Sequence, residues 1–323
     1  MTSAGLRPGF ETAVAPYRRE LYLHCYRMMA SPHDAEDVLQ ETLLRAWRAA
    51  DTYDAARGSL RTWLHRIATN ACLTALESRR SRPLPSGVGA RFDDPTAPFA
   101  PAPEVPWLVP LPVDPATSAV ERHRLRIALV AALQLLPARQ RAALLLREVL
   151  GLPAAEVADA LGMTTAGVNS ALQRARARLA ENRVEAQAVT AAPAEQRAVV
   201  DRYAAAFERA DVPAIVRLLA AEVVLEMPPM WNWYAGPVDY AGFMTRVYRT
   251  RGRDWRTVPV WANGEAGFTA YLDGALHSVQ VFTVSGGLVL RASVFADPVV
   301  FEVFGSAPRY PAPPGADRSD QHR

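Results

Sequence analysis

The sequence predicts a multidomain protein in which two all-helical domains precede an α+β domain. Three observations predict this order. Apolar residues recur at helical spacing from Phe10 to Arg80 and again from about Ala119 to Val184. Between these segments, residues 81–119 contain 10 Pro in 39 positions, and strand-like runs appear only from Val223 onward. We therefore expect helical domains at 1–82 and 119–186, an α+β domain at 195–305, linkers at 83–118 and 187–194, and a disordered tail at 306–323.

The first helical domain contains a helix that begins after Ser31-Pro32. Acidic residues crowd its first turn, where the helix dipole favours anions, and an apolar stripe runs from Ala35 to Trp47. Asp34, Asp37 and Glu41 project from one side, at i, i+3 and i+7. That side would repel nucleic acid and attract a basic protein partner, and an ordinary solvated helix face has the same spacing.

The next helix, Ser59 to Arg80, has the opposite character. It presents Arg61, Arg66 and Asn70 outward, and Trp63 lies near its start. Arginine beside an aromatic ring can hold single-stranded DNA by phosphate contact and base stacking. Trp63 is equally well explained as a core residue.

The proline-rich linker has no helical or strand period, so we expect it to be extended and largely unstructured. It is not uniformly polar, because residues 106–110 have the apolar sequence Pro-Trp-Leu-Val-Pro. Trp107 is costly to expose. We expect this short apolar stretch to dock onto a neighbouring domain.

The second helical domain contains a helix-turn-helix. Leu136-Pro137 starts a helix through Leu150, a short helix follows from Pro153 to Leu161, and a turn at residues 162–164 leads into a helix from Thr165 to about Leu179. Residues 120–185 carry 10 Arg against 6 acids. The last helix offers donors and acceptors suited to the major groove, and its candidate DNA-reading residues are Thr165, Asn169, Ser170, Gln173, Arg174 and Arg176.

The α+β domain is expected to begin with two helices, ending near Ala210 and Ala220, and to continue in strands. Aromatic residues suggest a pocket for a small-molecule ligand, with candidates Trp231, Trp233, Tyr234, Trp261, Tyr271 and His277. Glu226, Asp273 and His277 are the acid-base candidates. Catalysis needs a carboxylate and a base converging on one position, so we favour a sensor over an enzyme.

Several classes of protein are excluded by composition. Cys25 and Cys72 lie at neither metal-ligand nor redox-motif spacing, so we expect no metal and no cofactor. The N-terminus lacks the apolar core of a signal peptide, and no run of 18 apolar residues occurs. A soluble, cytoplasmic protein with no membrane partner is expected.

Three motifs follow one another along the chain: D-A-E-D-V-L-Q-E (34–41), L-R-T-W-L-H-R-I-A-T-N (60–70) and L-L-P-A-R-Q-R-A-A-L-L-L-R-E (135–148). They resemble regions 2 and 4 of bacterial sigma factors of the extracytoplasmic-function group. The resemblance implies a non-enzymatic protein whose partners are core RNA polymerase and promoter DNA. The resemblance assigns polymerase binding to Asp34, Asp37 and Glu41. It assigns contacts with the minus-10 element to Arg61, Trp63, Arg66 and Asn70, and contacts with the minus-35 element to the helix after Thr165.

The α+β domain resembles the polyketide-cyclase-like fold of the SnoaL or NTF2 type, which has the shape of a cone. Sigma factors of the sigma-G type subgroup carry such a fused domain, which implies a regulatory role. Asn169 and Ala171 stand where this family often has basic residues, which affects the expected sequence preference. The alternative is a stand-alone, ligand-responsive DNA-binding regulator, against which the acidic helix argues.

Overall fold

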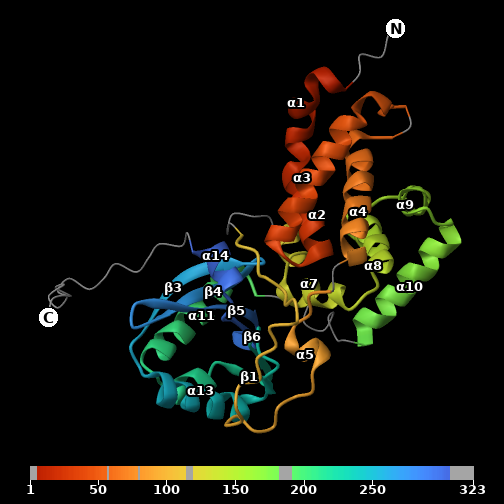
Figure 1. Ribbon diagram of the computed structural model, residues 1–323. Helices are drawn as coiled ribbons and strands as arrows, with labels where there is room; N and C mark the ends of the chain where they lie inside the picture. Colours follow the sequence, from red (N-terminus) through yellow and green to blue (C-terminus); the bar gives the residue numbers. More distant parts are fainter. Residues whose placement is uncertain (1–5, 57, 79–80, 114–118, 182–190, 306–323) are drawn as a thin grey trace, which may run out of the picture. The chain divides into compact units, whose positions relative to one another are not determined.

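The computed structural model describes residues 6–56, 58–78, 81–113, 119–181 and 191–305, and divides the chain into two compact units (Figure 1). We call them the helical unit (1–89, 103–111 and 117–189) and the α+β unit (90–102, 112–116 and 190–323). Both predicted helical domains therefore lie in one unit.

The N-terminal part of the helical unit is a bundle of α1 (Phe10–Val14), α2 (Arg18–Met29), α3 (Pro32–Arg48) and α4 (Leu60–Ser78). Helices α2, α3 and α4 pack against one another (Figure 1). Both cysteines are fully buried among apolar side chains in this core. Ser31 caps α3, since its Oγ accepts a hydrogen bond from the Asp34 backbone N–H at 3.3 Å. The start of α3 was therefore predicted correctly.

The second part of the helical unit contains the predicted helix-turn-helix. Its helices are α6 (Ala119–His123), α7 (Ile127–Gln134), α8 (Ala138–Leu144) continued by a π-helical turn to Val149, α9 (Ala154–Leu161) and α10 (Thr165–Glu181). Gly162 ends α9 in the left-handed region at φ 61°, which glycine adopts without steric cost. This agrees with the predicted break at residues 162–164.

Where it is described, the proline-rich linker has little helix or strand, as predicted, but it packs against other segments instead of forming a free tether. A short helix, α5 (Pro85–Val88), begins it. Proline leaves few backbone donors for a local helix, but the remaining N–H and C=O groups pair with distant segments. The expected docking of Pro106 to Pro110 is confirmed, with Trp107 buried. The backbone N–H of Val109 donates to Ala30 at 3.0 Å, and its carbonyl accepts from the Tyr26 hydroxyl at 3.1 Å.

The α+β unit consists of one six-stranded sheet covered by helices. Its strands lie in the order β2-β1-β6-β5-β4-β3, and only β1 and β6 pair in parallel. The strands are β1 (Leu219–Glu226), β2 (Trp233–Ala235), β3 (Trp255–Ala262), β4 (Glu265–Leu272), β5 (Ala275–Ser285) and β6 (Leu288–Phe295). The helices are α11 (Pro193–Glu208), α12 (Val212–Val216), α13 (Pro237–Arg251) and α14 (Pro298–Phe304). Helix α13 was not predicted.

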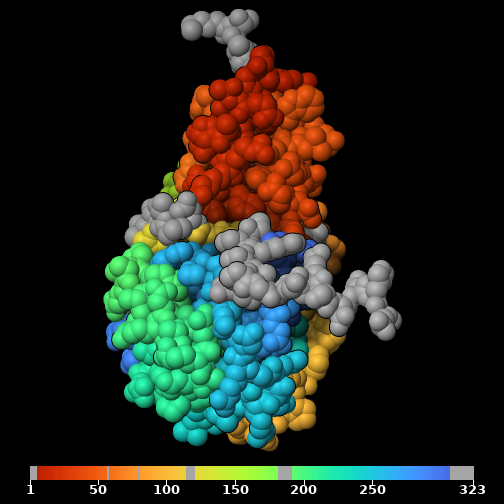
Figure 2. Space-filling view, turned by 90° about the vertical axis from the view of Figure 1, so that its left-hand side faces the viewer, coloured from red at the N-terminus to blue at the C-terminus, as the bar shows by residue number. Residues whose placement is uncertain are grey.

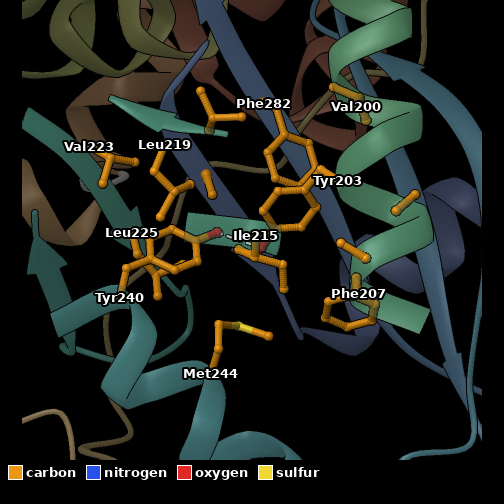
Figure 3. Close-up of a cluster of buried hydrophobic side chains, with 14 of the residues drawn as sticks. Val200, Tyr203, Phe207, Ile215, Leu219, Val223, Leu225, Tyr240, Met244 and Phe282 are labelled. Carbon is orange, nitrogen blue, oxygen red and sulfur yellow. Dashed lines mark hydrogen bonds between the residues drawn. The ribbon is translucent and has the colours of Figure 1, made fainter. Parts of the chain in front are cut away.

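Aromatic rings from helices and sheet form the core of the α+β unit. Figure 3 shows α11 directing Tyr203 toward Phe282 of β5, with Phe207 one turn further along the helix, while α13 contributes Tyr240 and Met244. The Tyr203 and Phe282 ring centroids lie 4.7 Å apart. Figure 2 shows the outer surface of α11, in green, beside the blue strands it covers. Such packing of helices on a curved sheet agrees with the predicted cone.

None of the described helices is both long enough and apolar enough to cross a membrane.

Candidate functional site

Helix α10 presents the expected polar face. Its candidate residues, Thr165, Asn169, Ser170, Gln173, Arg174 and Arg176, are all exposed, while Val168, Leu172 and Ala175 are buried. Arg176 donates to Glu148 at 2.7 Å. Ala171 is buried as well, so the absence of a basic side chain at that position has no bearing on contacts with DNA.

The acidic residues of α3 differ in their surroundings. Asp34 accepts two hydrogen bonds from Arg82, at 2.8 and 3.0 Å, and both side chains are largely buried. Glu41 pairs with Arg45 one turn later at 2.6 Å, and Asp37 is exposed. The surface of α3 thus has one acid held by a neighbouring segment and two near solvent.

Apolar side chains continue this surface toward the end of α3. Leu44 is 42% exposed and Trp47 is 46% exposed. The predicted apolar stripe therefore does not bury Trp47, whose ring instead carries the Arg7 guanidinium 5.0 Å from its centroid. Exposed large apolar groups beside acids are typical of protein-binding surfaces.

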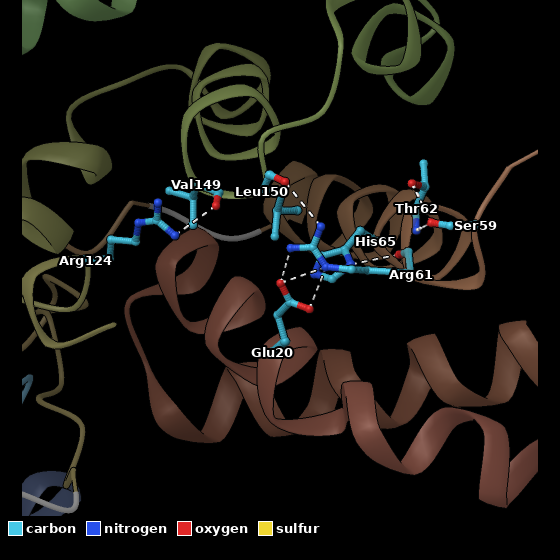
Figure 4. A network of polar contacts seen from close by, with 8 residues as sticks. All are labelled: Glu20, Ser59, Arg61, Thr62, His65, Arg124, Val149 and Leu150. Atoms are coloured by element: carbon cyan, nitrogen blue, oxygen red, sulfur yellow. Dashed lines mark hydrogen bonds and ion pairs between the residues drawn. The ribbon is translucent and has the colours of Figure 1, made fainter. Parts of the chain in front are cut away.

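Arg61 of α4 is engaged inside the helical unit (Figure 4). Its Nε donates to both carboxylate oxygens of Glu20, at 2.9 and 3.1 Å, and its Nη1 donates to the Leu150 carbonyl at 3.2 Å. Burial raises the pKa of Glu20, but the hydrogen bonds and charge of Arg61 outweigh it, and the pKa lies below its usual value. The pair is half-buried and links α2 to α4.

Two other residues of α4 line a groove in the helical unit. The groove has a volume of about 570 Å³ and lies among residues 52–54, the start of α4 and α9. Trp63 lines it together with Tyr53, and their ring centroids are 5.3 Å apart. Arg66 also lines the groove and pairs with Asp159 of α9 at 2.9 Å. Asn70 is exposed one turn beyond Arg66 and is not a lining residue.

Two histidines lie beneath this surface in the bundle core. His24 is buried, and its Nε2 lies 2.9 Å from the Thr69 hydroxyl. Burial, reinforced by repulsion from a protonated His65 and from Arg27, lowers the pKa of His24 well below its usual value. Burial lowers the pKa of His65 too. Both imidazoles are therefore neutral at pH 7.

Arg141 of α8 connects the two parts of the helical unit. The side chain is 1% exposed and donates to the carbonyl oxygen of Met28, at the end of α2. It also donates to the Gln134 Oε1 at 2.7 Å and to the Leu136 carbonyl at 3.2 Å. Burial lowers its pKa to about 10. Among the described residues no carboxylate pairs with it, so carbonyl oxygens at the ends of α2 and α7 balance its charge.

The α+β unit contains an apolar cavity of about 120 Å³. Of the six predicted pocket residues only His277 lines it, so the predicted set was wrong for Trp231, Trp233, Tyr234, Trp261 and Tyr271. Trp231 and Trp233 make backbone hydrogen bonds to Ala100 and Phe92 of the linker instead. Trp261 lies at the opposite end of β3 from Trp255, which does line the cavity.

Half of the other lining residues come from two helices. Tyr203 and Phe207 lie on α11, and Tyr240, Phe243 and Met244 lie on the unpredicted α13. The Tyr203 and Tyr240 hydroxyls are 2.6 Å apart, and burial raises both pKa values. Phe99 of the linker also lines the cavity, which nothing in its local sequence indicates.

The acid-base candidates do not converge. Glu226 is fully buried and accepts hydrogen bonds from Arg291 at 2.7 Å and from the Ser293 hydroxyl at 3.0 Å. Asp273 lies in the turn between β4 and β5. No acidic residue of the described chain lines the cavity beside His277. The geometry therefore lacks the carboxylate that the enzymatic interpretation requires.

The family models that match are Sigma-70 region 2, over residues 13–82, and Sigma-70, region 4, over residues 126–179. A relative in Mycobacterium tuberculosis, the ECF RNA polymerase sigma factor SigG, is 45% identical over 315 residues, covering 93% of this chain and 84% of the relative. The ECF RNA polymerase sigma factor SigM of the same species is 35% identical over 179 residues, covering 55% of this chain and 78% of the relative.

Among solved structures, the extracytoplasmic-function sigma factor SigJ of Mycobacterium tuberculosis matches with a TM-score of 0.66 and 22% identity, covering 94% of this chain and 99% of that chain. This likeness confirms the helical regions followed by a sheet-containing domain. The stand-alone regulator is not favoured, and sigma factors are transcription initiation factors, not enzymes. The chain belongs to the extracytoplasmic-function (ECF) RNA polymerase sigma factors.

Proposed function

We propose that this sigma factor directs core RNA polymerase to promoters through three separate surfaces of its helical unit, under control of the α+β unit. The observation that carries the proposal is the exposed face of α10, where polar and basic side chains follow one another without an acid from Thr165 to Ala180. Asn169, Gln173 and Arg174 can reach base edges from a helix in the major groove of the minus-35 element.

The groove beside α4 suits the minus-10 element. Trp63 and Tyr53 offer ring faces on which an unstacked base can lie, and Arg66 offers a guanidinium for a phosphate. Asp159 pairs with Arg66 in the structure, so this ion pair must break before Arg66 can contact a DNA phosphate. Asn70 extends the same exposed face, and Arg61 would have to leave Glu20 to reach DNA.

The surface of α3 suits a polymerase subunit. Asp37 and Glu41 supply charge, and Leu44 supplies exposed apolar area next to them. Asp34 shares the predicted side but is held by Arg82. A basic protein helix is the partner that such a mixture of acidic and apolar groups favours.

The α+β unit is proposed to regulate activity through the linker and to bind a small molecule. Three backbone hydrogen bonds of 2.8 to 3.1 Å tie residues 92–102 to residues 229–233. Asn232 adds a bond from the Ala100 N–H to its Oδ1 at 2.7 Å. Residues 90–102, if released and extended, could span up to about 45 Å of the tether between the matched regions. Docking of this segment therefore restricts how far the two DNA-binding regions separate.

The test of the DNA-reading assignment uses holoenzyme reconstituted with core polymerase and a promoter selected from genomic DNA. Arg174→Ala should weaken promoter binding by about 1 to 3 kcal/mol and relax specificity at one minus-35 base pair. Arg249→Ala removes the same charge from the exposed side of α13 and should leave binding unchanged. Equal effects of the two substitutions, or unchanged specificity in Arg174→Ala, would exclude α10 as the reading helix.

A further inference from the structure

The cavity of the α+β unit is small and mostly apolar. Its volume of about 120 Å³ is close to that of roughly 150 Å³ in an engineered apolar protein cavity that binds benzene. Its walls are formed by rings and thioethers, including Tyr203, Phe207, Trp255 and Met244. A single ring or a short branched chain fits this space.

The charged groups at the cavity are all basic. Arg246 and Arg251 of α13 line it, and no described carboxylate does. Thr250 and Arg251 are exposed, so the cavity opens to solvent at the end of α13. A charged ligand group is far less costly at this mouth than among the rings.

His277 adds a polar site to the wall. Its Nδ1 is buried and has no hydrogen-bond partner in the described part of the chain. Burial and the charge of Arg251 lower its pKa, which leaves the imidazole neutral. A neutral imidazole can bond to a polar ligand atom without adding a second cation.

We propose that this cavity binds a small monocarboxylic acid, with one ring or a short branched chain inside and its carboxylate at Arg246 and Arg251. The inference rests on the proposed ligand-binding role of the α+β unit. Arg246 also connects the ligand to the linker, because it donates to the Ala97 carbonyl and lies 4.7 Å from the Phe99 ring centroid. A bound acid therefore stabilises the docked linker segment.

Isothermal titration of the full chain with 4-methylbenzoate and its neutral analogue 4-methylbenzamide tests this directly. The acid should bind at least tenfold more tightly than the amide. Arg251→Gln should weaken acid binding at least fivefold and leave amide binding unchanged. Arg249→Gln makes the same charge change in the same helical turn, at an exposed residue that does not line the cavity, and should change neither. Val247→Phe should abolish binding of both by filling the cavity.

Equal binding of acid and amide, equal effects of the two arginine substitutions, or no binding of either probe would overturn the proposal. Hydrogen exchange tests the coupling to the linker. The Phe92 and Ala102 amides, bonded to the carbonyls of Trp233 and Pro229, should exchange at least threefold more slowly with 4-methylbenzoate. Titration needs neither polymerase nor DNA, so its failure would leave the proposed promoter-binding function intact, and failure of transcription would leave the titration result intact.

Discussion

Replacement of Arg141 by methionine tests how the helical unit is held together. The guanidinium bonds α8 to Met28 at the end of α2, and it is nearly inaccessible to solvent. Methionine has a similar length and no donors. After the substitution, the buried acceptors of Met28 and Leu136 lose a charged donor and receive no replacement.

The expected magnitude follows from these two carbonyls. A buried polar group left without its partner costs about 1 to 3 kcal/mol, so for two carbonyls we expect the free energy of unfolding to fall by about 2 to 6 kcal/mol. Replacing a buried ion pair by apolar groups can be neutral, but here the acceptors are backbone carbonyls that remain in place. With a urea slope of about 2 kcal/mol/M, the midpoint should fall by about 1 to 3 M.

Urea unfolding of the full chain, followed by circular dichroism of the helices, measures this change. Arg139→Met is the matched control, since Arg139 is exposed on the same helix and makes one long bond of 3.4 Å to Leu161. Its midpoint should not change. A shift in Arg141→Met below about 0.3 M would refute the role given to these hydrogen bonds.

Three further predictions concern other parts of the molecule. Asp159→Asn removes the ion pair with Arg66 and should raise the affinity for single-stranded minus-10 DNA about two- to fivefold, because exposed pairs contribute at most about 1 kcal/mol. Fluorescence anisotropy measures this affinity. An unchanged affinity would count against the groove as the binding site for minus-10 DNA. His24 has a lowered pKa in the folded state, so stability is complete above pH 6.5 and falls by up to about 1.4 kcal/mol per pH unit below it. Urea midpoints between pH 7.5 and 5.5 should show this slope, and His24→Gln should reduce it; an equal slope in both proteins would contradict the assignment. Phe99→Ala should make residues 90–102 more susceptible to limited proteolysis, while Val238→Ala, at a site 84% exposed, should not; equal cleavage in the two variants would contradict docking through Phe99.

The helix-turn-helix could be predicted because its signals are local. Pro137 and Pro153 mark the starts of α8 and α9, and Gly162 adopts the positive φ that ends α9. The polar face of α10 followed from its 3.6-residue period alone. Exposed helix faces can be predicted from the sequence because they depend only on the spacing of polar and apolar residues within one helix.

The packing of residues 90–102 and the residues that line the cavity could not be predicted because their contacts are distant in sequence. Ala100 bonds to Asn232, 132 residues away, and proline content alone gives no sign of this partner. Lining residues were sought mainly among the aromatic residues of the strands and of the segment before α13, whereas α11 and α13 supply nine of the 19 lining residues. Arg61 was likewise predicted to contact DNA, because the sequence does not show that the fold brings Glu20 within hydrogen-bond distance of it.

Run-off transcription with purified core polymerase, on a promoter selected from genomic DNA, tests the central claim most directly. The full chain should yield a specific transcript, and Asn232→Ala, which removes the side-chain bond to the Ala100 N–H, should change its amount without changing its start site. Core polymerase alone should yield no such transcript. Duplex binding by the chain without any polymerase-dependent transcript would contradict the assignment as a sigma factor. An unchanged amount of transcript from Asn232→Ala would contradict control through the linker.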